Sequence, residues 1–131
     1  MFLSNTGGKE ITSATLSAWQ EGRQRQDLEL RDFEPLIHRG AFNEAGGLHH
    51  SAVIERSLVD HFVPFLPLER KHVRRCAEAR GAGRALTEEE IGRVLDEMTF
   101  WPSDTRLFSQ TGCKRVAQKV DMVLEERYDD L

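Results

Sequence analysis

The sequence predicts a mostly α-helical fold with a few short β elements. Apolar residues recur at spacings of three and four along several segments, which is typical of amphipathic helices. Short aromatic runs interrupted by proline, as in 62–68, suit extended chain instead. The 131 residues include 39% hydrophobic and 31% charged side chains, which is enough for a small core under a charged surface. These patterns indicate about five helices and two or three short strands.

The chain starts with an expected strand end and a first helix. Phe2 and Leu3 precede a Ser-Asn-Thr-Gly-Gly run, and this order predicts a short buried strand that turns out of a sheet. Along 9–21 the apolar side chains fall on one helical face, and Gly22 is placed to end the helix. The side chains on that face are Ile11, Ala14, Ala18 and Trp19.

A second helix, a loop and a short helix are expected next. Asp32 is the expected cap of the second helix, in which Pro35 is tolerated because it lies near the first turn. The inward side of this helix carries Phe33, Leu36, Ile37 and Ala41. Residues 43–50 are rich in glycine and predict an exposed loop, and 53–58 predict a short helix.

A hydrophobic seam precedes the next helix. Residues 62–68 combine aromatic and β-branched residues with two prolines, which predicts a buried edge strand or an extended connector. A helix is expected over 68–80, with Gly81 at its end. Its apolar face carries Val73, Cys76 and Ala77, and its basic face carries Arg70, Lys71, Arg74 and Arg75. Because Glu69 and Glu78 dilute the basic face, it predicts a solvated surface rather than a nucleic-acid site.

Two more helices are expected towards the C-terminus. Thr87-Glu-Glu-Glu90 has the form of a capping box at the start of the first. Leu107 and Phe108 are expected to form a brief extended piece, and Thr111 is the expected cap of the last helix. The apolar faces carry Ile91, Val94, Leu95 and Met98 in one helix and Val116, Val120, Val123 and Leu124 in the other.

Charge and composition exclude several classes of protein. The 18 basic and 22 acidic side chains give a net charge of -4, which argues against a wide nucleic-acid-binding surface. No uncharged stretch reaches the about 20 apolar residues of a membrane-spanning helix. The first residues lack the basic start and apolar core of a secretory signal. His49 and His50 point apart and no further ligand completes a known spacing, so no metal site is expected.

Thr111-Gly-Cys-Lys114 is the most informative local feature. A helix N-terminus offers unpaired N–H groups, Gly112 allows a ligand to approach the backbone, and Lys114 adds a positive charge. The segment predicts either an anion pocket or an ordinary capped helix with a solvated lysine. Cys76 and Cys113 also allow two interpretations: they form a disulfide, or they are two separate core thiols.

The sequence contains no complete catalytic set. Asn5 precedes two glycines, where its amide either faces a ligand at the end of a sheet or occupies a turn. The chain has no G-x-x-x-x-G-K-[ST] loop, no apolar run ending in paired acidic residues, no G-x-S-x-G and no H-E-x-x-H. From the residues alone, no enzymatic reaction is assigned.

Four phrases follow one another along the chain: Phe2-Leu-Ser-Asn5, Phe62-Val-Pro-Phe-Leu-Pro-Leu-Glu69, Glu97-Met-Thr-Phe-Trp-Pro102 and Leu107-Phe-Ser-Gln-Thr-Gly-Cys-Lys114. Together they resemble the C-terminal part of the torsins, AAA+ ATPases of the endoplasmic reticulum lumen and nuclear envelope. The resemblance implies that 1–67 are the C-terminal remnant of the large αβα domain and that 68–131 are the small helical lid. The sequence is accordingly expected to be a fragment of a longer protein.

The resemblance also implies roles for individual residues. Asn5 matches sensor 1, whose amide helps to position the water that attacks the γ-phosphate. Lys114 matches sensor 2, which reaches the nucleotide phosphates from the lid, next to Gly112. Cys76 and Cys113 match a pair that forms a redox-sensitive disulfide, which an oxidising lumen makes accessible.

The implied function is ATP-driven remodelling of proteins or membranes, with Mg-ATP bound by the complete protein. The implied partners are other torsin subunits and a membrane-anchored luminal activator that supplies an arginine finger. Because the Walker A and Walker B segments are absent from the sequence, this chain alone is expected neither to hold Mg-ATP tightly nor to hydrolyse it. The alternative is a non-catalytic interaction module that binds a torsin subunit or the luminal domain of a membrane partner.

Overall fold

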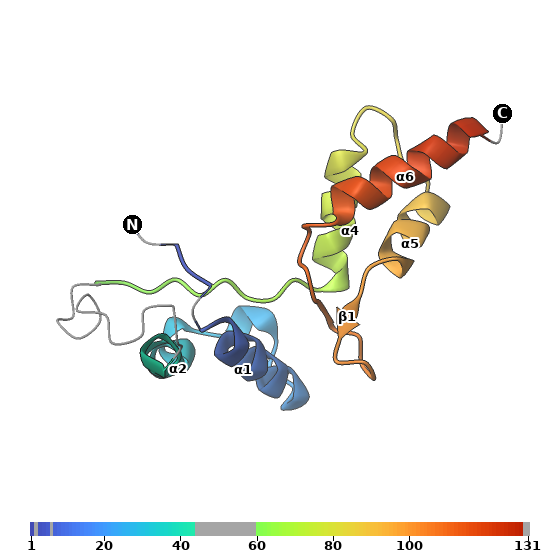
Figure 1. Cartoon of the computed structure of the whole chain (residues 1–131). Coiled ribbons are helices and arrows are strands. Elements are labelled where there is room, and N and C mark those ends of the chain that lie inside the picture. The colour runs from blue at the N-terminus through green and yellow to red at the C-terminus, as the bar shows by residue number, and fades with distance from the viewer. Residues whose placement is uncertain (2, 6, 44–59, 130–131) are drawn as a thin grey trace. The chain divides into compact units, whose positions relative to one another are not determined.

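The described chain divides into two mostly helical units (Figure 1). The computed structural model describes residues 1, 3–5, 7–43 and 60–129, and the units are Met1–Leu66 and Pro67–Leu131. The described residues contain five α-helices, one 3-10 helix and one two-stranded sheet, so the prediction of a mostly α fold with short β elements is confirmed. None of the described helices is both long enough and apolar enough to cross a bilayer. The identification of the units with parts of an AAA+ domain stays a prediction.

The first unit is built on two packed helices. Helix α1 (Gly8–Gln20) and helix α2 (Leu30–Asn43) are joined through the 3-10 helix η1 (Arg25–Asp27) and pack against each other. Their shared core consists of Ile11, Phe33 and Ile37. Gly22 has a φ of 83°, the left-handed conformation that commonly ends helices, so its predicted role as a helix stop is confirmed.

Two predictions for the start of the first unit are wrong. Leu3 is 78% exposed and belongs to no strand, because no neighbouring strand pairs with it in the described part of the chain. Trp19 was expected to face inward but is 45% exposed. The packed face of α1 runs through Ile11 and Ala18, and Trp19 lies one residue, about 100°, further round the helix.

Helix α2 begins earlier than the sequence predicts. It starts at Leu30, and the carboxylate of Asp32 accepts a hydrogen bond at 2.8 Å from the backbone N–H of Glu29. Asp32 therefore closes the first turn from inside the helix instead of capping it. Pro35 consequently lies inside the helix, past its first turn.

The segment 60–66 is an extended connector, not a strand. Phe62 and Leu66 pack against the core of the first unit, whereas Val63 and Phe65 are 75% and 79% exposed. Side chains on opposite faces alternate along extended chain. The predicted connector is confirmed, and the predicted burial holds for only one of its two faces.

The second unit packs three helices around one core. Helices α4 (Arg70–Arg80), α5 (Glu88–Asp96) and α6 (Val116–Asp129) contact one another in all three pairs (Figure 1). The core residues are Val73, Ala77, Ile91, Val94, Leu95, Met98, Phe100, Val116, Val120, Val123 and Leu124. The apolar spacing of each predicted helix is thereby confirmed, and Gly81 ends α4 as expected.

A small hairpin joins α5 to α6. Strand β1 (Phe100–Trp101) pairs antiparallel with strand β2 (Phe108–Ser109), and Phe108 also bridges to Glu69 at the start of α4. The extended piece at Phe108 is confirmed, whereas its partner β1 was not predicted. A two-residue strand carries too little alternation to be recognised without knowledge of its partner.

The last helix begins at Val116 and not after a cap at Thr111. Residues 111–115 form a turn in which Thr111 accepts a hydrogen bond from the N–H of Lys114, and Cys113 accepts one from the N–H of Val116. Gly112 has a φ of 57°, which departs from helical geometry. The prediction of Thr111 as the helix cap is therefore wrong.

Five sequence predictions fall outside what the structure describes. They concern Phe2, the inward side chain of Ala41, most of the loop at 43–50, the short helix at 53–58 and the pair His49-His50.

Candidate functional site

A disulfide joins α4 to the turn before α6. The sulfur atoms of Cys76 and Cys113 are bonded, across a sequence separation of 37 residues and with their Cα atoms 6.3 Å apart. Both cysteines are partly buried against the core of the second unit. Of the two arrangements that the sequence left open, the structure has the disulfide.

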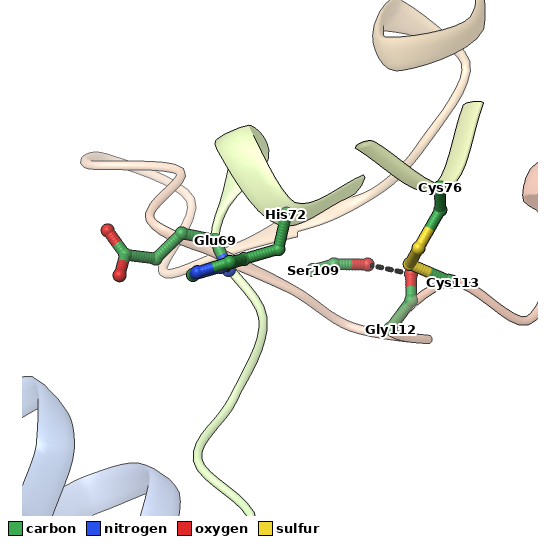
Figure 2. Close-up of a disulfide and its surroundings, with 6 residues drawn as sticks. All are labelled: Glu69, His72, Cys76, Ser109, Gly112 and Cys113. Atoms are coloured by element: carbon green, nitrogen blue, oxygen red, sulfur yellow. Dashed lines mark hydrogen bonds between the residues drawn. A yellow bond between two sulfur atoms is a disulfide. The ribbon is translucent and has the colours of Figure 1, made fainter. Parts of the chain in front are cut away.

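The turn that carries Cys113 is also held by hydrogen bonds. Figure 2 shows the hydroxyl of Ser109 directed at the carbonyl oxygen of Gly112, to which it donates a hydrogen bond of 2.8 Å. The N–H of Ser109 donates to the carbonyl oxygen of Leu68, also at 2.8 Å. The N–H of Gln110 donates to the carbonyl oxygen of Thr99. The turn is thus anchored to Thr99, just before β1, to Leu68, just before α4, and, through the disulfide, to α4 itself.

Lys114 lies on the exposed side of this turn. Its ammonium group makes no hydrogen bond or ion pair with the residues that the structure describes. The N–H groups of Lys114 and Val116 are both occupied by backbone carbonyls, at 3.1 Å each. An anion bound here would therefore depend on the Lys114 side chain rather than on these two N–H groups. The carbonyl oxygen of Gly112 is already occupied by Ser109.

The start of α4 has a histidine cap that the sequence did not reveal. Nδ1 of His72 accepts a hydrogen bond of 2.9 Å from the backbone N–H of Glu69. Figure 2 places both residues at the end of α4 that precedes Cys76. The usual capping-box pattern has Glu or Gln at the third helical position, so a histidine there gives no clear signal.

A partly buried ion pair connects α5 and α6 within the same unit. Glu90 is almost fully buried, and its carboxylate accepts hydrogen bonds from Arg127 and from the backbone N–H of Thr87. The Arg127 hydrogen bond, and then the Thr87 N–H, hold the pKa of Glu90 below its ordinary value. The capping box at Thr87 and Glu90 is confirmed. The contact with Arg127 spans too much sequence to have been predicted.

The predicted sensor 1 residue belongs to the first unit. Asn5 is exposed, and its carbonyl oxygen accepts a hydrogen bond of 3.2 Å from the N–H of Gly8, at the start of α1. Asn5 thus occupies a turn before a helix. Its assignment as sensor 1 stays a prediction.

No metal centre is formed by the residues within the described ranges. No group of three or more His, Cys, Asp or Glu side chains gathers there. His49 and His50 lie outside those ranges.

Comparison with known proteins identifies relatives of both units. Residues 68–123 match the family model described as "Torsin-1A, C-terminal domain". A "Torsin-like protein" from Caenorhabditis elegans is 42% identical to the chain over 127 residues. That alignment covers 93% of this chain and 36% of the relative, so the chain spans little more than a third of the relative's length.

Proposed function

Because the chain belongs to the torsin family, we propose that residues 68–131 act as the nucleotide-sensing lid of an AAA+ ATPase. Within this proposal Lys114 is sensor 2 and contacts the phosphates of bound ATP from the turn next to Gly112. Asn5, in the first unit, is sensor 1 and positions the attacking water. The activity itself, ATP hydrolysis coupled to remodelling of proteins or membranes, requires Walker A and Walker B segments that this sequence does not contain.

The observation that carries the proposal is the environment of Lys114. An unpaired, exposed ammonium group can exchange water for phosphate oxygens without breaking an existing ion pair. The turn that carries it is covalently attached to α4 through the adjacent Cys113. A cation on an anchored turn transmits a pull from the nucleotide to the helices of the lid, which is what a sensor requires.

The disulfide supports the proposed location in the endoplasmic reticulum lumen or nuclear envelope. Disulfides persist in oxidising compartments and are rare in reducing ones. Since Cys113 immediately precedes Lys114, reduction of the bond would release the turn from α4 while leaving its hydrogen bonds. We therefore expect the redox state of the pair to alter how Lys114 engages nucleotide.

The proposed partners are other torsin subunits and a membrane-anchored luminal activator that supplies an arginine finger. In AAA+ enzymes such a finger stabilises the charge that develops during phosphoryl transfer. Under the alternative function, the chain binds one of these partners without taking part in catalysis. A Lys114 that contributes nothing to nucleotide affinity would favour this alternative.

The test uses a torsin that contains a Walker A loop and whose C-terminal domain is replaced by residues 68–131 of this chain. A fluorescent ATP analogue is titrated onto this chimera and onto its Lys114→Ala variant. Loss of a charge-assisted phosphate contact is expected to weaken binding about tenfold to a hundredfold.

The matched control is Arg115→Ala. Arg115 is the adjacent exposed cation, and it forms no ion pair among the described residues. The Arg115→Ala substitution should leave the affinity of the chimera for the ATP analogue close to that of the unaltered chimera. Equal affinity of the Lys114→Ala chimera and its parent would eliminate the sensor role.

A further inference from the structure

Ser109 occupies an unusual place next to the disulfide. It is 8% exposed, although it is a polar residue at the end of a two-residue strand. Its hydroxyl donates to the carbonyl oxygen of Gly112, which belongs to the peptide unit that leads directly into Cys113. The hydroxyl therefore acts on the backbone that orients Cys113.

Strand β2, which contains Ser109, is hydrogen-bonded to the residues that lead into α4, the helix that carries the other cysteine. The N–H of Ser109 donates to Leu68, and its neighbour Phe108 bridges to Glu69, immediately before α4. Cys76 lies on α4 itself. The hydroxyl thus connects a frame that includes the start of α4 to the peptide of Cys113, as Figure 2 shows.

The hydrogen bond and the disulfide order the same short turn. Closing the disulfide requires Cys113 to be held opposite Cys76, and the turn loses conformational entropy when this happens. A hydrogen bond that already holds the Gly112–Cys113 peptide removes part of that cost. By linkage, each of the two interactions must then strengthen the other by the same factor.

We propose that Ser109 is a positioning residue for the Cys76–Cys113 disulfide: its hydroxyl holds the turn in the arrangement that brings the two thiols together. The proposal deepens the redox part of the proposed function and rests on it. Its effect is on the equilibrium between the dithiol and the disulfide, not on the chemistry of either sulfur.

The reaction considered is exchange with a small disulfide such as oxidised glutathione. One protein thiolate attacks the small disulfide, forms a mixed disulfide and expels one glutathione thiolate. The second protein thiolate then attacks the protein sulfur of the mixed disulfide and expels the second. The protein gives up two electrons and two protons in total, and two molecules of reduced glutathione are formed.

The experiment measures this equilibrium in the full 131-residue chain. The protein is equilibrated in mixtures of reduced and oxidised glutathione and quenched with acid. Alkylation followed by mass spectrometry then gives the fraction oxidised. Ser109→Ala should shift the equilibrium about three- to tenfold towards the dithiol, because the variant loses one hydrogen bond. Ser109→Thr, which retains a hydroxyl, should stay within about twofold of the natural protein.

The control is Ser103→Ala, because Ser103 is an exposed serine in the turn between β1 and β2. It should leave the equilibrium unchanged. An unchanged equilibrium in Ser109→Ala, or a Ser109→Thr variant that behaves like Ser109→Ala, would overturn the proposal.

A second measurement separates positioning from a general loss of stability. Denaturant unfolding of Ser109→Ala is compared in the oxidised and the reduced protein. Positioning predicts a larger loss in the oxidised form, and equal losses would overturn it. Neither experiment contains nucleotide, so a failed Lys114 test with an intact Ser109 effect refutes the proposed nucleotide role alone.

Discussion

Glu90 and Arg127 show how a single residue contact joins distant parts of the chain. Besides its two contacts with Arg127, Glu90 accepts a hydrogen bond of 3.0 Å from the N–H of Thr87, its partner in the capping box. Arg127 also donates to the carbonyl oxygens of Arg84 and Ala85. One carboxylate therefore ties the start of α5 to the last turns of α6.

Replacing Glu90 by Gln should remove a pH-dependent part of the stability. Folding lowers the pKa of Glu90, so its ion pair stabilises the fold fully above the ordinary glutamate value and loses this contribution as the pH falls through the lowered value. At pH 7 we expect Glu90→Gln to reduce the free energy of unfolding by about 1–2 kcal/mol. The difference from the natural protein should shrink below about pH 4. Denaturant unfolding at several pH values measures both effects.

Glu89→Gln provides the control for this prediction. Glu89 is the neighbouring, exposed glutamate in the first turn of α5, so it shares the helix dipole but lacks the buried contacts. Its replacement should change the stability by no more than about 0.5 kcal/mol. If Glu89→Gln reduced the free energy of unfolding as much as Glu90→Gln does, the effect would come from the helix dipole and not from the contact with Arg127.

At the scale of the element, two glycines of the second unit should respond in opposite ways to alanine. Gly92 lies inside α5, and a Cβ there would meet no atom within 4 Å. Gly92→Ala should therefore stabilise the protein by about 0.5–1 kcal/mol, because alanine loses less backbone entropy in a helix. At Gly81 a Cβ would lie 2.6 Å from Cγ of Leu86, so Gly81→Ala should destabilise it.

Thermal unfolding of the two variants checks this pair of predictions. Because both positions have ordinary negative φ values, the contrast isolates available space from backbone strain. A destabilising Gly92→Ala variant would mean that α5 does not hold the described conformation in solution.

At the same scale, sequence patterns predict the interior of a helix better than its ends. The core positions of α5 can be predicted from apolar spacing alone, and the capping-box pattern at Thr87 predicts where the helix starts. The start of α6 could not be predicted in the same way. A threonine followed by glycine is compatible with a helix cap and equally with a turn, so Thr111 gave a misleading signal. Gly112 has a left-handed backbone conformation and Cys113 is held in the disulfide, and the helix begins only after them, at Val116.

At the scale of the whole molecule, the two units should respond differently to reduction. The disulfide closes a loop of 37 residues within the second unit, which is worth about 3–4 kcal/mol if it acts through loop entropy. Reduction should therefore speed amide hydrogen exchange in α4, α5 and α6. Exchange in α1 and α2 should stay unchanged, since their core is separate.

Hydrogen exchange followed by mass spectrometry measures each helix separately. The Cys76→Ser/Cys113→Ser variant is the control, because it should show fast exchange in the second unit with or without reductant. Equal acceleration in α1 and in α4 would contradict the prediction and show that the two units unfold together.

The sequence by itself determined the mostly helical class, the core faces of the helices and the family resemblance, because each rests on residues close together in the chain or on short phrases. It also singled out Cys76, Cys113 and Lys114. Only the tertiary structure decided that the cysteines are bonded, that Ser109 holds their turn and that Arg127 reaches Glu90. These contacts join residues whose approach depends on how the helices pack, and no local pattern encodes that packing.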